Sequence, residues 1–289
     1  MIHRNNTRRF LLPALLLALA LAGNLSFSSG ISGASARTAV PPMPPLGCTV
    51  VGWGRNDDGQ LNIPAGLSGV AAVAGGQYHS LALKSDGTVV GWGADYQGQA
   101  TPPAGLSNVT AIAAGDEHSL ALKSDGTVVG WGANGFGQLN IPAGLSGVTA
   151  IAAGAVHSLA LKSDGTVVGW GNNGDGQATP PAGLSGVTAI AAGHRHSLAL
   201  KSDGTVVGWG NDGNGQATPP AGLSGVTAVA AGGRHSLALK SDGTVVGCSN
   251  SRLARKKLNM VDLGQRVSAL ERQPLRNGGK SVRSDGPGV

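Results

Sequence analysis

The chain carries one pattern of apolar and polar positions that recurs at a fixed interval. The stretch "HSLALKSDGTVVGWG" occurs unchanged at residues 79–93, 118–132, 157–171 and 196–210, and a fifth copy at 235–249 differs only in its last two residues. Each copy begins 39 residues after the one before it. A fixed period of this size is typical of stacked repeat arrays and propellers. The sequence therefore indicates an array of one repeated structural unit.

Within one repeat, the apolar pattern predicts three strands. The run "VTAIAAG" at 109–115 alternates between β-branched and small residues, and "HSLALK" and "TVVGWG" are two further short apolar runs. The "SDG" between these two is a strong hairpin signal, because Asp favours the turn and Gly adopts a positive φ at little cost. The Gly-, Pro- and Asn-rich segment "ANGFGQLNIPAGLSG" then leads to the next unit. These features predict an all-β protein.

Histidine and tryptophan recur once in each repeat. The histidines are His79, His118, His157, His196 and His235, and the tryptophans are Trp53, Trp92, Trp131, Trp170 and Trp209. A catalytic site needs one asymmetric cleft, so five equivalent His-Ser pairs favour a structural role. We expect His and Ser to bond to neighbouring backbone, and the tryptophans to pack between units as anchors.

The repeat also resembles a known family. The phrase "GWGxNxxGQ…PxGLSGVTAIAAGxxHSLALKSDG" is similar to the regulator of chromosome condensation repeat, and in its 39-residue form it is most similar to secreted bacterial propellers such as the β-lactamase inhibitor protein of the second type. The resemblance covers residues 49–247. It implies a β-propeller with one repeat for each blade.

The number of repeats departs from that resemblance. The chain has about five hairpin-bearing units and one orphan strand at residues 49–54, whereas family members typically close a ring with more blades. We therefore expect an all-β propeller of about five three- to four-stranded blades, with a ring that is either incomplete or open. An incomplete ring would favour a homo-oligomer, because a second chain of near-identical repeats could complete it.

Composition divides the chain into four parts. Residues 1–36 combine a basic start with a short apolar run and are predicted to be a signal peptide, with the Sec or twin-arginine route left open. Residues 37–48 are a Pro-rich lead-in, and residues 49–249 are the repeat array. Residues 250–289 form a basic tail without the repeat. The tail is either an irregular, disordered or short helical segment, or the product of a frameshift.

The charge of the chain belongs mainly to its ends. The formal net charge of +6 is divided into +3 for residues 1–36, −3 for residues 37–249 and +6 for residues 250–289. The array is thus mildly acidic, which argues against nucleic acid as its partner. After signal cleavage, we expect no membrane span.

The repeats differ from one another mainly in two places. One is the pair of residues before each His, and the other is the loop after each "GWG". Because successive antiparallel strands reverse direction, both places fall on one face of the array and the constant "SDG" turns on the other. Aromatic and charged side chains there are typical of a protein-binding surface. The candidate residues are Gln77, Tyr78, Tyr96, Asp116, Glu117, Phe136, His194, Arg195 and Arg234.

The sequence contains no cluster with the spacing of a zinc or calcium site, so we expect no metal and no cofactor. We therefore predict an exported, secreted, periplasmic or cell-surface protein that is not an enzyme and binds an unknown protein partner. Two alternatives stay open. The resemblance implies either a β-lactamase inhibitor or a regulator of a small GTPase, and other propellers are hydrolases or lyases.

Overall fold

The computed structural model describes residues 49–248, and these fold into five small antiparallel sheets without a helix. Each sheet has three strands in chain order, and we call it a blade. The first strands are β1 (Val70–Gly75), β4 (Val109–Ala114), β7 (Val148–Ala153), β10 (Val187–Ala192) and β13 (Val226–Ala231). The second strands are β2 (His79–Lys84), β5 (His118–Lys123), β8 (His157–Lys162), β11 (His196–Lys201) and β14 (Ser236–Lys240). The third strands are β3 (Val89–Gly93), β6 (Val128–Gly132), β9 (Val167–Gly171), β12 (Val206–Gly210) and β15 (Val245–Cys248).

The "SDG" turn joins the second and third strands of each blade as predicted. In the first blade, the backbone N–H of Lys84 donates to Thr88 O over 2.9 Å, and Gly87 takes a φ of 80°. The Asp86 side chain accepts from the backbone N–H of Thr88 over 3.0 Å. The same register repeats in the other blades, with each His opposite the Gly that ends the third strand in blades 1 to 4.

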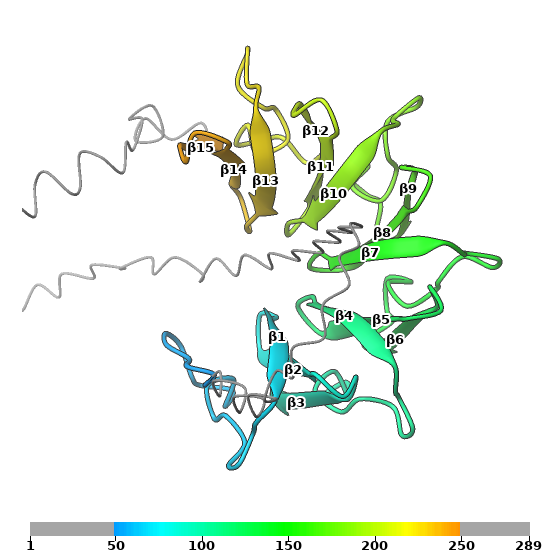
Figure 1. Ribbon diagram of the computed structural model, residues 1–289, viewed down its shortest axis with the longest axis vertical. Helices are drawn as coiled ribbons and strands as arrows, with labels where there is room; N and C mark the ends of the chain where they lie inside the picture. The colour runs from blue at the N-terminus through cyan, green and yellow to red at the C-terminus, as the bar shows by residue number, and fades with distance from the viewer. Residues whose placement is uncertain (1–48, 249–289) are drawn as a thin grey trace, which may run out of the picture.

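The five blades stand side by side in an arc, with the first and the fifth at its two ends and an opening between them (Figure 1). The first strand of each blade contacts the first strand of the next, from β1 to β13. The expectation of an all-β propeller of about five blades is thereby confirmed, with three strands in each blade and an open ring.

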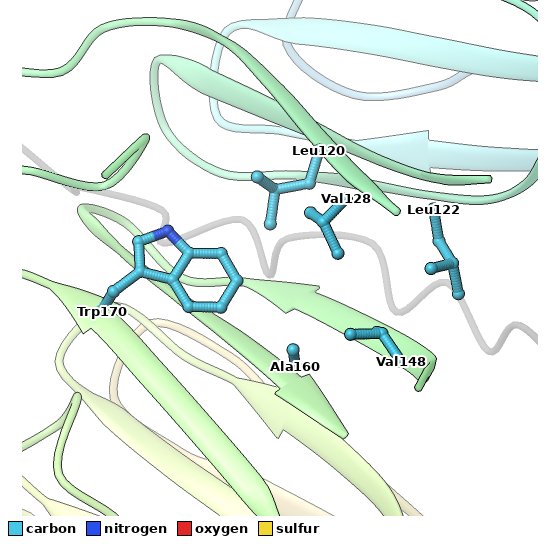
Figure 2. Close-up of a cluster of buried hydrophobic side chains, with 6 residues drawn as sticks. All are labelled: Leu120, Leu122, Val128, Val148, Ala160 and Trp170. Atoms are coloured by element: carbon cyan, nitrogen blue, oxygen red, sulfur yellow. The ribbon is translucent and has the colours of Figure 1, made fainter. Parts of the chain in front are cut away.

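The core lies between the blades, because each small sheet buries its faces against its neighbours. Between the second and third blades, Leu120 and Leu122 pack with Val148, Ala160 and Trp170 (Figure 2). Trp131 and Trp209 occupy the equivalent positions at two other interfaces. Three tryptophans thus anchor blade packing as predicted, since all three are at most 7% exposed.

Trp53 and the segment that carries it differ from the prediction. Residues 49–54 form no strand, although their sequence "TVVGWG" is identical to that of Thr88 and the strand β3 that follows it. The Trp53 side chain is 70% exposed, so the prediction that it packs as a structural anchor is wrong. The physical reason is that no second strand lies beside residues 49–54 within the described part of the chain, and an isolated strand has no ladder to join.

The remaining predictions concern the structural role of His235 and the segments on either side of the array. His235 lies one residue before β14 and is only half-buried, because no blade follows the fifth one among the described residues. The predicted signal peptide, the Pro-rich lead-in and the basic tail lie outside residues 49–248. They stay predictions.

Candidate protein-binding face

The two variable places of each repeat lie next to each other at one end of the blade. The carbonyl oxygen of Tyr78 accepts a hydrogen bond from the backbone N–H of Ala94 over 2.9 Å. The same bond joins Glu117 to Ala133 over 2.8 Å in the second blade. It recurs in the third and fourth blades, at Val156–Asn172 and Arg195–Asn211. The first four blades therefore present both variable segments together, and we call this end of the array the variable face.

The candidate residues of the variable face differ in exposure. Six are exposed and three are half-buried. The exposed ones are Gln77, Tyr96, Phe136, His194, Arg195 and Arg234, and the half-buried ones are Tyr78, Asp116 and Glu117. Tyr96 and Phe136 are the most informative, because they are 74% and 58% exposed and are large apolar side chains. Side chains of this kind at an exposed position are available to a partner.

In the first blade and the loop before it, aromatic and charged side chains form one cluster. The hydroxyl group of Tyr96 donates to Asp58 Oδ1 over 2.9 Å. The Arg55 guanidinium lies 3.4 Å from Asp58 Oδ2 and 5.9 Å from the centre of the Tyr78 ring. Asp57 accepts from Arg55 Nε over 2.8 Å, and this pairing is the main reason that the pKa of Arg55 is raised. These contacts hold two tyrosines from different loops in one arrangement.

A second group of contacts connects that cluster to later blades. With the Gln77 amide oriented so that both of its ends find partners, its oxygen accepts from the Tyr78 hydroxyl over 2.8 Å, and its nitrogen donates to the Asp116 carboxylate at 2.7 and 3.0 Å. Asp116 also faces His194 of the fourth blade, with 3.4 Å between Oδ2 and Nε2. Burial raises the pKa of Asp116, and the nearby His194 opposes this effect. The variable loops of the first, second and fourth blades are thus joined by side chains.

The fourth and fifth blades carry the basic part of the face. Arg195 Nη1 lies 3.7 Å from Asp175 Oδ2, and Asn211 donates to Asp175 Oδ1 over 2.9 Å. Arg234 in the fifth blade is exposed. Sequence comparison of the repeats identified the loops but missed Arg55, Asp58 and Asp175 as contributors. Their only signal was a charged side chain inside a variable loop.

The opposite face repeats one arrangement without variation. Each constant turn pairs its Lys with its Asp, as in Lys84–Asp86 at 2.9 Å and Lys162–Asp164 at 3.0 Å. Hydrogen bonds from Thr88 and the Lys84 ammonium lower the pKa of Asp86. Exposed pairs of this kind contribute little to stability, and their uniformity offers a partner no distinguishing feature.

The recurrent His and Ser link successive blades. His118 Nε2 lies 3.1 Å from Ser158 Oγ of the next blade, and that hydroxyl donates to Gln138 O over 2.9 Å. The Trp170 indole N–H donates to the same carbonyl oxygen over 2.8 Å. Equivalent His–Ser pairs begin at His79, His157 and His196. The expected bond of Ser to backbone is present, but His bonds to a side chain forty residues away.

This geometry differs from that of a Ser–His nucleophile. There, the serine must give its proton to the imidazole. Here, the Ser158 hydroxyl donates to a backbone carbonyl and therefore accepts from the Nε2–H of His118. Burial lowers the pKa of His118 to about 4, so the imidazole is neutral at pH 7. Within residues 49–248, no three His, Cys, Asp or Glu side chains gather where they could hold a metal ion.

A family model for the regulator of chromosome condensation (RCC1) repeat matches the chain five times. The matched segments are residues 70–99, 109–138, 148–177, 187–216 and 226–252. The chain belongs to the RCC1 repeat family. Each match begins at the first strand of a blade and includes the following "GQ" of the connector, except the last, which ends in the tail. A comparison of the RCC1-repeat chain with curated proteins gave no match.

Solved RCC1-type structures have the same fold. Prp20p from Saccharomyces cerevisiae is 23% identical with a TM-score of 0.59, and the match covers 68% of this chain and 66% of Prp20p, just under two thirds of its length. The ectodomain of the Physcomitrella patens receptor kinase CR4 is 24% identical with a TM-score of 0.54, covering 65% of this chain and 54% of that one. Human WBSCR16 is 22% identical with a TM-score of 0.51, covering 62% and 61%. At these identities the similarity shows the fold alone.

A membrane-spanning helix would need a long apolar helical segment. Residues 49–248 contain no helix of that length and apolarity.

Proposed function

We propose that this RCC1-repeat protein is exported and binds another protein through its variable face, without catalysing a reaction. The observation that carries this proposal is the contrast between the two ends of the blades. One end repeats the same Lys–Asp turn five times, whereas the other gathers Tyr78, Tyr96 and Arg55 in one bonded cluster. Tyrosine and arginine are among the residues that contribute most to protein interfaces.

The contacts within the cluster support binding for a second reason. Tyr96 is tied to Asp58, and Tyr78 is tied through Gln77 to Asp116, so these side chains are ordered before a partner arrives. Pre-ordered side chains lose less conformational entropy on binding, which leaves more of the contact energy for affinity. Phe136 adds exposed apolar area on the same face.

Related structures are consistent with protein binding. The yeast structure of Prp20p is described together with its binding properties to Gsp1p and histones, and the same protein was solved bound to Kap60. These partners belong to Prp20p. What supports the present proposal is that the same fold serves there as a protein-binding scaffold.

The proposal of a non-enzymatic role rests on the recurrent Ser and His. Ser119, Ser158 and Ser197 each direct their hydroxyl hydrogen to a backbone carbonyl, so none is set up to be activated by the adjacent imidazole. The proposal of export rests on the signal-like residues 1–36.

The test uses partner capture followed by measured affinity. Proteins retained by the natural chain are identified by mass spectrometry, and the dissociation constant of the retained partner is then measured for Tyr78→Ala and Tyr96→Ala. We expect each to weaken binding by about 2 kcal/mol, or roughly 30-fold, as is typical of interface anchors. Lys162→Ala, on the constant turn of the third blade, is the matched control and should change affinity by less than about twofold. Unchanged affinity for both tyrosine variants, or an equal loss for Lys162→Ala, would refute the proposed face.

A further inference from the structure

The fifth blade lacks the tryptophan that the third strand carries in each of the other four blades. In the first blade, Trp92 pairs across the ladder with Ser80, and both donate to Gln60 O, at 2.8 and 2.9 Å. In the fifth blade, Cys248 occupies the position opposite Ser236. Among the described residues, Gln216 O accepts a side-chain hydrogen bond from Ser236 alone, over 2.7 Å.

A pocket lies where that tryptophan would be. It is small and partly open to solvent, and it is lined by Leu198, Leu223, Gln216, Ser236 and Ala238, among others. One repeat earlier, the equivalent residues surround an indole ring. Trp209 packs there with Leu159, Leu184 and Ala199 and donates to Gln177 O over 2.9 Å. The fifth-blade pocket therefore has the walls and the acceptor of a tryptophan site.

At the other end of the array, the Trp53 side chain is not packed in any pocket of the described residues. Residues 49–54 read "TVVGWG", the same text that forms the third strand of four blades. In the structure they form no strand, and Val51 and Trp53 are each 70% exposed. Within residues 49–248, the Trp53 indole N–H has no hydrogen-bond acceptor, whereas the other four indoles donate to a Gln carbonyl.

We propose that residues 49–54 of a second copy replace β15 beside β14, so that Trp53 of that copy fills the fifth-blade pocket. The incoming strand has the residues that the second strand pairs with in the other four blades. Its Trp53 would lie opposite Ser236 and would donate to Gln216 O, as Trp92 does to Gln60 O. The strand it displaces has only four residues and lacks the indole.

A second copy is favoured over closure within one chain. The first and fifth blades stand at opposite ends of the arc (Figure 1). Four interfaces set their separation, each with a His–Ser contact of 2.8 to 3.1 Å, and closure within one chain would have to work against these contacts. A second molecule can offer its residues 49–54 without altering these contacts. Because the two surfaces lie at different ends, such a contact builds closed rings or open chains.

The test uses two single variants and their mixture, with light scattering after size-exclusion chromatography. The natural chain should associate as its concentration rises. Trp53→Ala keeps the pocket and loses the indole, and Cys248→Trp keeps Trp53 and fills the pocket from its own β15. Each variant alone should associate at least about tenfold more weakly than the natural chain, because the indole contact is missing or already made. An equimolar mixture should form a heterodimer, since one variant supplies the pocket and the other the strand.

Three results would overturn the proposal. Trp53→Ala could self-associate as strongly as the natural chain, or the mixed variants could remain monomeric. The natural chain could also be monomeric at every concentration. If the natural chain is monomeric, acrylamide quenching of the Trp53 fluorescence, taken as the difference between the natural chain and Trp53→Ala, shows why. Shielded Trp53 would indicate closure within one chain, and freely quenched Trp53 would indicate an unfilled pocket. These results measure self-association without any captured partner, so they are distinct from the test of the variable face.

Discussion

Replacing Ser158 with alanine tests the link between blades most sharply. The Ser158 hydroxyl is fully buried, donates to Gln138 O over 2.9 Å and lies 3.1 Å from His118 Nε2. Alanine removes both contacts. Gln138 O keeps the indole N–H of Trp170 as a donor, so the main loss there is about 0.5–1.5 kcal/mol for one hydrogen bond. The His118 N–H is left buried without an acceptor, which costs about 1–3 kcal/mol.

The expected loss for Ser158→Ala is therefore about 2–4 kcal/mol in the free energy of unfolding, measured by urea denaturation followed by circular dichroism. Ser80→Ala is the matched control. Ser80 makes the same bond to Gln60 O over 2.9 Å, but it is the first blade's serine and no His of a preceding blade contacts it within residues 49–248. Its loss should be about 1 kcal/mol. Equal losses for the two variants would show that the His–Ser contact does not stabilise the array.

The other predictions concern pH and the close approach of backbone at the blade interfaces. Burial lowers the pKa of His118 to about 4 and that of His157 to about 3, below the value of about 6.5 expected in the unfolded chain. Both imidazoles stay neutral in the folded state below pH 6.5, whereas those of the unfolded chain take up protons. The free energy of unfolding should therefore be greatest above pH 6.5 and fall as the pH drops toward 4, by up to about 1.4 kcal/mol per pH unit for each histidine. Constant urea midpoints between pH 7 and pH 5 would contradict this. Gly115→Ala should destabilise the protein by about 1–3 kcal/mol, because its Cβ would overlap Gly154 O and the His118 ring. Gly75→Ala has open space around its Cβ and should be neutral or stabilising by up to about 1 kcal/mol, so a thermal melt that ranks the two alike would contradict the packing.

The three-stranded blade could be predicted from the sequence, because each of its strands and turns is specified by nearby residues. "SDG" fixes the hairpin, and the 39-residue step fixes which residues are equivalent. Trp53 shows the limit of this reasoning. Residues 49–54 have the text of a third strand, yet they form none, because a strand also requires a partner to complete its ladder. The cross-blade bond of His118 was missed for a related reason. Its acceptor, Ser158, is forty residues away and belongs to the next unit.

The variable face was only partly predictable. Comparison of the repeats found the loops, because they are where the repeats differ. Antiparallel pairing then predicted that both variable segments lie at one end of a blade. It could not find which charged residues pair across loops. Asp58 contacts Tyr96, and Asp116 contacts His194 two blades away, and both contacts depend on how the blades are placed in space.

Protein footprinting of the complex tests the proposed binding face most directly. The natural chain, with and without its captured partner, is exposed to hydroxyl radicals, and the oxidation rate of each side chain is compared. The proposal predicts that Tyr78, Tyr96 and Phe136 become protected while Lys162 in the constant turn keeps its rate. Protection of the constant turns, with unchanged rates at the three aromatic residues, would contradict it.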